Sequence, residues 1–538
     1  MKTTIVLCFG LIAALSFLPS SVADAQPFNA GVADVVTDRE VERPLIVDRM
    51  VIDETTTNPV RTLIDALLAD NRKIDNRTVP IVVEFCNVDI DLTGQSLTIG
   101  SHRSLIASPG CERSPRRLGP RIFVTDNPPG EARQKLFVIR GDYVTFSGFR
   151  LEGPNPGIWG GDENTSFAIA VNPYEDDPAI TDPDSVALPI RRIEVSNMEI
   201  FHWSGGAIYV TDNSGKAIRG RLFNTNEGAV RIVHNFLHHN RHDAGYGYGV
   251  DVAGGAYALI ERNVFDENRH AIAGGSGNGK GDYSGYTLRE NLILPGGGLH
   301  CLANWGFMNC WYTHQIDMHG DKDWWRLGQA CCGTAGETMI IQRNTILYTG
   351  GSDWHVLPWL RNGNAIKIRG NPTDKVIVDG NVFRHAGLSN AIAQNGDLVA
   401  TCVVLIGWPC VTTSGDKITR PIIVRSNNVF GANPLNGLAS CDFVGDGRND
   451  QFMATGVTWW AKSPITEQWR YLNTMPQKMA ELQLIDLDND GICDVAERSS
   501  RPEIPPRRYS KSGTAPWVQW LGSTDPTSNN APGGGVIQ

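Results

Sequence analysis

The sequence lacks several features that would indicate other classes of protein. Basic residues are not in excess, because 48 Lys and Arg face 58 Asp and Glu, which gives a formal net charge of −10. A protein that coats nucleic acid needs clustered basic residues against the phosphates, so the composition argues against that partner. Beyond residue 18 no apolar run is long enough to span a membrane, and few stretches carry a helical pattern.

Glycine is abundant instead, with 57 residues, and many Val, Ile and Phe pairs lie between turn-forming residues. This composition indicates β structure with frequent tight turns. With 538 residues, 41% of them hydrophobic, the chain can build one long repeat domain and a smaller unit.

Residues 1–25 have the pattern of a secretory signal peptide. Lys2 precedes an apolar run from Ile5 to Leu18, and residues 23–25 form an A-x-A cleavage site. The run of about 14 residues is too short for a membrane anchor, which needs roughly 20. We therefore predict an exported chain, secreted or periplasmic, that begins at Gln26.

Removal of Cys8 with the signal would leave an even number of the 11 cysteines, which in an exported protein predicts disulfides. The preferred pairs are local ones, namely Cys86 with Cys111, Cys402 with Cys410, and Cys441 with Cys493. The pairing of the remaining four stays open: Cys301, Cys310, Cys331 and Cys332.

The clearest internal repeat lies within residues 238–275. Asn-Arg-His occurs at 240–242 and again at 268–270, and each copy follows an Asn-apolar-apolar step, so the offset is 28 residues for both features. Self-similarity at such a period is typical of a solenoid, in which each coil presents the same turn at the same place.

One asparagine position can be followed through much of the chain. Its members are Asn197, Asn235, Asn263, Asn291, Asn344, Asn381 and Asn428. The unequal spacings indicate loops of different length inserted into a common coil. Because an Asn at a turn can hydrogen-bond to its own backbone and stack on the Asn of the next coil, we predict a ladder of seven asparagines.

This pattern resembles the right-handed parallel β-helix family, which includes pectate lyases, polygalacturonases, alginate epimerases and phage tailspikes. The resemblance covers residues 80–435 and implies an all-β solenoid. Before it, residues 26–79 contain an amphipathic stretch at 58–70 that predicts a capping helix. The resemblance is specific for the fold and less so for an activity.

After residue 436 a second repeat type begins, and it runs to about 525 before a tail, 526–538, that predicts disorder. Its two acidic loops match at an offset of 44 residues, with Asp442, Asp446 and Asp450 in the first and Asp486, Asp490 and Asp494 in the second. They resemble FG-GAP or VCBS repeats, whose acidic loops usually hold calcium. Asp488 adds a further carboxylate to the second loop, and alternate carboxylates around a Gly turn suit a hard cation. Val444 makes the first loop the weaker candidate.

An alignment of five strands predicts a groove on the solenoid. The strands superpose on Ile208, Val250, Ile272, Ile316 and Ile366. If these aliphatic residues point inward, the alternate positions point outward. Small residues at Ala253, Ala273 and Gly275 then form a floor between charged ones. The catalytic candidates on and beside this face are Asp251, His270, His314, Asp317, His319, Lys367 and Arg369.

Two chemistries fit these residues. In a lyase of an acidic glycan, Lys or Arg neutralises the uronate carboxylate while a nearby base takes the adjacent proton. In a glycoside hydrolase, Asp251 and Asp317 would flank the bond at near 10 Å, about two strand spacings. Basic candidates outnumber carboxylates, so the lyase is slightly favoured. A non-catalytic surface or glycan-binding protein is the alternative from another class, because fold alone implies no activity.

A zinc site is a third possibility, since His314-x-x-Asp317-x-His319 contains suitable ligands. In a regular strand, however, positions 314 and 317 face opposite ways, which weighs against zinc. Flat aromatic faces suit sugar rings. The candidate substrate contacts beside the groove are Arg241, His242, Tyr246, Tyr248, Arg269, Trp324 and Trp325.

Overall fold

The computed structural model describes most of the chain from residue 47 onward. The described residues are 47–74, 76–107, 119–127, 134–156, 165–171, 192–211, 230–242, 246–275, 284–304, 307–320, 333–350, 363–394, 417–499 and 506–519, with the backbone alone at 299–311. The predicted signal peptide and the tail at 526–538 therefore lie outside the described residues.

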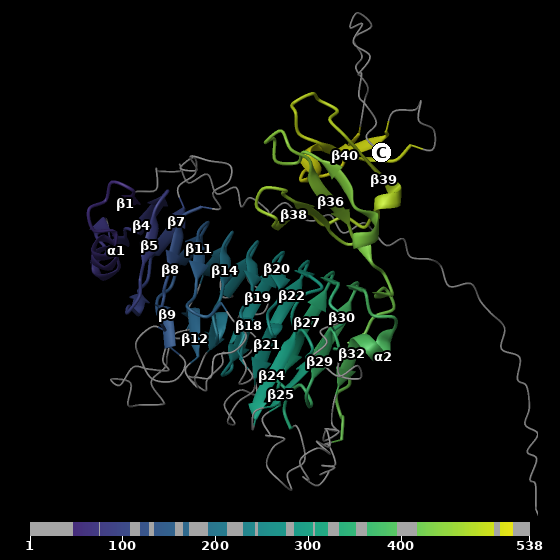
Figure 1. The fold of residues 1–538 in the computed structure, drawn as a ribbon, viewed down its shortest axis with the longest axis horizontal. Coiled ribbons are helices and arrows are strands. Elements are labelled where there is room, and N and C mark those ends of the chain that lie inside the picture. Colours follow the sequence, from purple (N-terminus) through teal and green to yellow (C-terminus); the bar gives the residue numbers. More distant parts are fainter. Residues whose placement is uncertain are drawn as a thin grey trace, which may run out of the picture. The chain divides into compact units, whose positions relative to one another are not determined.

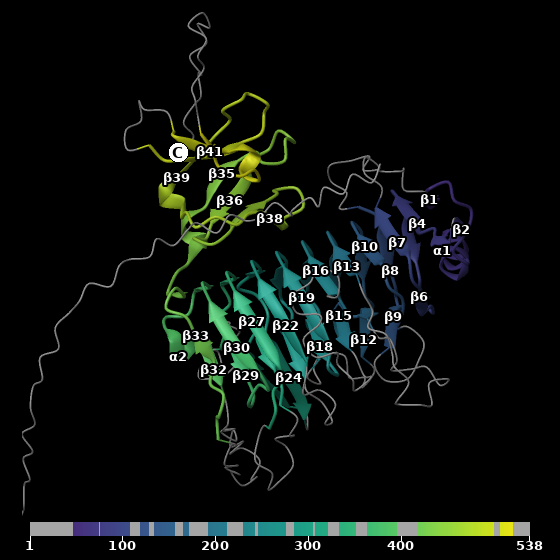
Figure 2. The same ribbon diagram turned by 180° about the vertical axis from the view of Figure 1, so that it is seen from behind.

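The described chain forms a parallel β-helix built from three stacked sheets (Figure 1). The first sheet, which Figure 2 shows from behind, consists of β1 (Asp48–Asp53), β4 (Ile81–Cys86), β7 (Arg103–Ala107), β10 (Val144–Ser147), β13 (Ile193–Ser196), β16 (Val230–Val233), β19 (Tyr257–Glu261), β22 (Gly285–Arg289), β27 (Thr338–Gln342), β30 (Lys375–Asp379) and β33 (Ile423–Val424).

The second sheet consists of β5 (Asp89–Asp91), β8 (Arg121–Phe123), β11 (Arg150–Glu152), β14 (Glu199–Phe201), β17 (Phe236–His238), β20 (Val264–Asp266), β23 (Leu292–Ile293), β28 (Thr345–Ile346), β31 (Val382–Phe383) and β34 (Val429–Phe430). The third consists of β6 (Leu97–Ile99), β9 (Gln134–Ile139), β12 (Ser166–Val171), β15 (Gly206–Thr211), β18 (Tyr248–Ala253), β21 (His270–Gly275), β26 (Ile316–Met318), β29 (Ile366–Ile368) and β32 (Ile392–Gln394). Each complete coil contributes one strand to each sheet, which confirms the predicted fold class.

A sharp turn joins the first sheet to the second in successive coils. The residue at this turn has a positive φ, for example 59° at His234, 55° at Arg262 and 59° at Glu290. The next residue is the buried asparagine of the ladder. Its side-chain oxygen accepts hydrogen bonds from the backbone N–H and the side-chain amide of the preceding asparagine, both at 2.9 Å for Asn235 and Asn263.

The ladder runs through six asparagines, each at most 9% exposed: Asn235, Asn263, Asn291, Asn344, Asn381 and Asn428. Asn197 was predicted as its first member, and this is wrong. Met198 occupies the ladder position and donates its N–H to Asn235 at 3.0 Å. Asn197 is exposed at the turn position before it, with φ 52°, because asparagine tolerates left-handed backbone better than most residues.

The N-terminal end is closed as predicted by a helix, α1 (Pro59–Leu68). Asn58 caps it by accepting a hydrogen bond from the N–H of Arg61 at 3.0 Å. Leu63 and Leu67 pack into the solenoid core. Strand β1 precedes the helix and pairs with β4, so the first sheet begins before residue 80. No helix among the described residues is long and apolar enough to cross a membrane.

Smaller elements lie on the connections between coils. They are β2 (Lys73–Ile74), β3 (Arg77–Thr78), the hairpin β24 (Leu299–Asn304) with β25 (Phe307–Tyr312), and α2 (Leu388–Ala391). The hairpin register places Cys301 opposite Cys310. Cys111, Cys331, Cys332, Cys402 and Cys410 lie outside the described residues.

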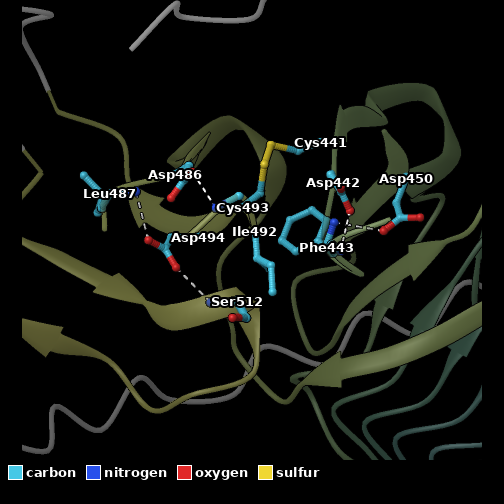
Figure 3. Close-up of a disulfide and its surroundings, with 12 residues drawn as sticks. Cys441, Asp442, Phe443, Asp450, Asp486, Leu487, Ile492, Cys493, Asp494 and Ser512 are labelled. Atoms are coloured by element: carbon cyan, nitrogen blue, oxygen red, sulfur yellow. Dashed lines mark hydrogen bonds between the residues drawn. A yellow bond between two sulfur atoms is a disulfide. The ribbon is translucent and has the colours of Figure 1, made fainter. Parts of the chain in front are cut away.

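A C-terminal module follows the last coil. It contains two antiparallel sheets, the first of β35 (Ala439–Cys441), β36 (Asp450–Ala454), β37 (Trp459–Lys462) and β38 (Trp469–Asn473), and the second of β39 (Leu482–Ile485), β40 (Asp494–Glu497), β41 (Arg508–Ser510) and β42 (Val518–Gln519). The predicted disulfide between Cys441 and Cys493 joins them across a Cα–Cα distance of 6.0 Å (Figure 3).

The module packs against the outer face of the second sheet. Met453, Trp460 and Trp469 form one apolar cluster with residues of that sheet, including Val264 and Leu292. Gln468 also donates a hydrogen bond to Glu199 at 2.6 Å. These contacts lie on the second sheet and include residues of β14, β17, β20 and β23.

Replacing one ladder asparagine should weaken the whole solenoid. In Asn263→Ala the buried N–H of Asn235 and the carbonyl of Ile232 lose their partner. We expect a loss of about 1–3 kcal/mol in the free energy of unfolding, measured by urea denaturation. Asn197→Gly is the matched control, because glycine suits the positive φ there, and it should stay within about 0.5 kcal/mol. Equal losses in the two variants would contradict the ladder's role.

Candidate active site

The third sheet aligns the predicted site residues in the predicted register. Ile208, Val250, Ile272, Ile316 and Ile366 pair across five successive strands. All five belong to the hydrophobic core of the solenoid, so they do point inward. The predicted alignment of these strands is therefore confirmed.

The outward positions follow from that register. Asp251 on β18 pairs with Ala273 on β21, and Asp317 on β26 pairs with Lys367 on β29. Gly275 forms an isolated bridge with His319. A Cβ atom placed on Gly275 would meet nothing within 4 Å, so the surface is open at that point. The full extent of the predicted groove stays a prediction.

Asp317 is the centre of the site. Its carboxylate is fully buried, yet it lies beside three side chains that carry or can carry positive charge. Nε2 of His319 is 2.8 Å from Oδ2, and Nε of Arg369 donates to Oδ1 at 3.2 Å. Burial alone would raise the pKa of Asp317, but Arg369, with His319 and His314, holds it well below its usual range. Asp317 is therefore a fixed negative charge.

Three rings stack beside this carboxylate. The ring centroids of Tyr248 and His270 are 5.8 Å apart with planes 4° from parallel, and those of His270 and His314 are 4.5 Å apart. Nδ1 of His270 contacts the main-chain oxygen of His314. Burial lowers the pKa of His314 to about 3, and burial together with Arg269 holds that of His270 well below its usual value. Both imidazoles are therefore neutral near pH 7.

His314 lies on the same side as Asp317, with Nε2 3.0 Å from Oδ2, and the predicted opposition of these two positions is wrong. The reason is local. The N–H groups of Gln315 and Ile316 both donate to the carbonyl of Ala365, at 3.3 and 2.9 Å. Two residues thus oppose one, as in a β-bulge, and regular alternation begins only with β26 at Ile316.

Lys367 and Arg369 share the outer side of the segment that starts with β29. Arg369 is held on Asp317, whereas Lys367 makes no hydrogen bond or ion pair within the described part of the chain. Burial, and then the charge of Arg369, lowers the pKa of Lys367. A lysine with a lowered pKa is unprotonated in a larger fraction of molecules near neutral pH than an exposed lysine, so more of it is available to act as a base.

The residues predicted to contact substrate lie in different surroundings. Tyr248 belongs to the ring stack, and Arg269 donates to its hydroxyl at 3.2 Å. Arg241 instead forms an ion pair with Glu267 in the next coil, which indicates a structural role. His242 is buried beside Tyr246, with ring centroids 6.2 Å apart. Trp324 and Trp325 lie outside the described residues.

Several supporting residues carried no recognisable signal in the sequence. Thr313 and Gln315 both donate to the main-chain oxygen of Arg269, which fixes the segment before His270. Tyr286 donates from the core to the main-chain oxygen of Asp317 at 3.0 Å. These hydrogen bonds fix the backbone of the site. They form only when neighbouring coils pack against each other, so the sequence alone does not reveal them.

The acidic loops of the C-terminal module repeat the same hydrogen bonds at the predicted offset. Phe443 donates its N–H to Asp450, and Leu487 donates to Asp494, at 2.9 and 3.0 Å. Gly447 and Gly491 likewise donate to Asp442 and Asp486, at 2.7 and 3.0 Å (Figure 3 shows both loops).

The two loops differ in how they arrange carboxylates. Oxygens of Asp486, Asp488 and Asp494 lie within 4.8 Å of one another, and among the described residues the first loop forms no such group. Val444 stands where the second loop has Asp488, which explains the difference. Asp490 points to Lys511, 3.2 Å away, and Asp446 accepts a hydrogen bond from the N–H of Arg448.

No protein-family model, no curated protein and no solved structure matches this chain.

The buried pair of Asp317 and Arg369 should show strong coupling. Asp317→Ala leaves the guanidinium without its counter-charge, and we expect a loss of about 3–5 kcal/mol in the free energy of unfolding. The double variant with Arg369→Ala should lose less than the sum of the single losses, because no uncompensated charge remains. Urea denaturation of the parent and three variants measures this coupling. Additive losses would show that the two side chains do not depend on each other.

Proposed function

We propose that the chain is an exported enzyme that cleaves an acidic, uronate-containing polysaccharide by β-elimination on the outer face of the third sheet. Lys367 carries this proposal, as a partly buried lysine with a lowered pKa and no hydrogen-bond or ion-pair partner among the described residues, two residues from Arg369. The β-helix fold and the signal-like N-terminus support the same assignment to the polysaccharide-acting members of the resembled family.

The elimination needs a base and a neutralising cation. Arg369 is held by Asp317 through Nε and Nη2, so its remaining N–H donors have a fixed direction and would bind the uronate carboxylate. Unprotonated Lys367 would then take the proton from the carbon next to that carboxylate. The electron pair forms a carbon–carbon double bond, the bond to the glycosidic oxygen breaks, and water protonates that oxygen.

Hydrolysis fits the site less well. A glycoside hydrolase needs one carboxyl group that donates a proton and a second that acts as base or nucleophile. Asp317 is fully buried, ion-paired and held ionised, so it has no proton to donate and no access to sugar. Of the two carboxylates predicted for hydrolysis, only Asp251 would then remain. A glycan-binding protein remains the competing function, and product analysis separates it from an enzyme.

Substitution of the base tests the proposal. Lys367→Ala should lower turnover of a uronate polymer by about 10²–10⁴-fold, because a positioned base contributes that much. Lys375→Ala is the control, since Lys375 lies in the first sheet beside Asp374. Activity is followed by the ultraviolet absorbance of the unsaturated sugar and, in parallel, by reducing ends. Reducing ends without unsaturated product would establish hydrolysis, and unchanged polymer across a uronate panel would leave only binding.

We also propose that the C-terminal module is a pair of FG-GAP-like repeats with calcium in the second loop. The three grouped carboxylates of Asp486, Asp488 and Asp494 support this, since calcium takes several oxygen ligands. Lys511 contacts Asp488 at 2.5 Å and would move aside when the ion binds. The first loop is the weaker candidate because its carboxylates are not grouped.

Calcium should stabilise the module. At a concentration about 100 times the dissociation constant, a bound ligand adds about 2.7 kcal/mol, so chelator should lower the module's melting temperature. In Asp488→Ala this response should disappear, whereas Asp89→Ala, an exposed aspartate of the second sheet, should keep it. Differential scanning calorimetry with and without chelator measures the effect. A chelator response that Asp488→Ala leaves intact would place the ion elsewhere, and no response in the parent would remove calcium from the proposal.

A further inference from the structure

We propose that His270, His314 and Asp317 bind a divalent transition-metal ion of the zinc class on the third sheet. The inference stands apart from the proposed lyase function, because it concerns binding without substrate. Strand alternation predicted that positions 314 and 317 face opposite sides of the sheet, and this site requires them to lie on the same side.

The distances suit such an ion. One ligand atom from each of the three side chains lies within 4.8 Å of the other two. Nε2 of His314 is 3.0 Å and Nε2 of His270 is 3.9 Å from Oδ2 of Asp317. Tetrahedral zinc with bonds of about 2.0–2.2 Å holds its ligand atoms about 3.3–3.6 Å apart. The two observed distances bracket that range, so small side-chain rotations admit the ion.

Within the described part of the chain, two of the ligand atoms are buried nitrogens without a hydrogen-bond partner. Nδ1 of His270 contacts the main-chain oxygen of His314, and a carbonyl oxygen only accepts. Nδ1 therefore carries the proton, and Nε2 presents a lone pair toward Asp317. This Nε2 is fully buried and unpartnered, and Nε2 of His314 lacks hydrogen-bond alignment. Such buried atoms are rare and need an explanation, which a bound metal supplies.

The contact between Nδ1 of His270 and the main-chain oxygen of His314 is of a kind that is common in metal sites. A metal-binding histidine almost always donates its other ring N–H to a carbonyl or carboxylate, which fixes the orientation of the ring. His270 has that arrangement through His314, and the ring stack with Tyr248 restrains it further. The nitrogen is thus held in place before any ion arrives.

The donor set selects the class of ion. Two imidazole nitrogens and one carboxylate oxygen suit zinc and neighbouring first-row metals, whereas calcium and magnesium take oxygen ligands. This site and the acidic loop of the C-terminal module would therefore bind different ions. That difference allows each to be filled separately.

Arg369 and His319 complete the surroundings. Nε of Arg369 donates to Oδ1 of Asp317 at 3.2 Å, and this bond can persist when Oδ2 binds the metal. The contact from Nη2 of Arg369 to Oδ2 is the one that the ion would replace. Nε2 of His319 is 2.8 Å from Oδ2 and also contacts Nη2 of Arg369, so it could become the fourth ligand only when the ion replaces that guanidinium group, and water is the alternative.

Cobalt is the probe for this site. The full-length chain is stripped with chelator, given excess calcium to fill the acidic loop, and titrated with Co²⁺ and then Zn²⁺. We expect one Co²⁺ per chain with the visible absorption of tetrahedral coordination, displaced by Zn²⁺. His270→Phe and His314→Gln should each lose more affinity than the about 10–100-fold typical of removing an outer hydrogen-bond partner.

His102→Gln is the matched control, because His102 stacks on Tyr143 away from the third sheet, and it should bind like the parent. Unchanged binding in both ligand variants, or no tetrahedral spectrum in the parent, would overturn the inference. If either variant fails to fold by circular dichroism, X-ray absorption of the zinc-loaded parent decides. Imidazole scattering beyond a nitrogen and oxygen shell supports the site, and its absence rejects it. Because no substrate is present, the lyase proposal can fail independently.

Discussion

The hydrogen bonds of the asparagine ladder fix how successive coils stack, and the rest of the solenoid depends on that stacking. Each side-chain oxygen accepts two hydrogen bonds from the asparagine of the preceding coil. The side-chain amide of Asn263 also donates a hydrogen bond to the main-chain oxygen of Ile232 in that preceding coil. A slip by one residue would break these bonds and turn each strand's apolar face outward. The ladder lies at a turn, yet it thereby sets the register of the third sheet, where Asp317 meets Lys367.

Much of the fold could be predicted because two independent patterns agree. The asparagine position and the aligned aliphatic residues mark the same coils, although the spacing between coils varies. The error at Asn197 shows where the pattern becomes ambiguous. Asparagine suits both the ladder and the left-handed residue before it, so Met198 could not be recognised as the ladder position from spacing alone.

The sequence could predict which residues share the outer face of the third sheet, but not how their side chains are arranged there. Alternation correctly placed Asp317 with Lys367, because both lie within regular strands. It failed at His314, because a main-chain irregularity at Gln315 and Ile316 adds a residue before the strand. Such a bulge forms when two successive N–H groups donate to the same carbonyl of the next coil. No residue type requires it, so the sequence carries no signal for it.

A buried carboxylate then explains why so many charged groups gather on this face. Asp317 would be costly to bury alone, and the protein compensates with cations and imidazoles around it. The same ion pair also restricts the position of Arg369, because its departure would leave the buried charge of Asp317 unpaired. The ordering gives a guanidinium of fixed direction beside Lys367, which has no partner among the described residues, and two imidazole nitrogens that face the same oxygen. In the two proposals the metal would bind Asp317 itself, whereas the substrate would bind Arg369, which Asp317 holds in place.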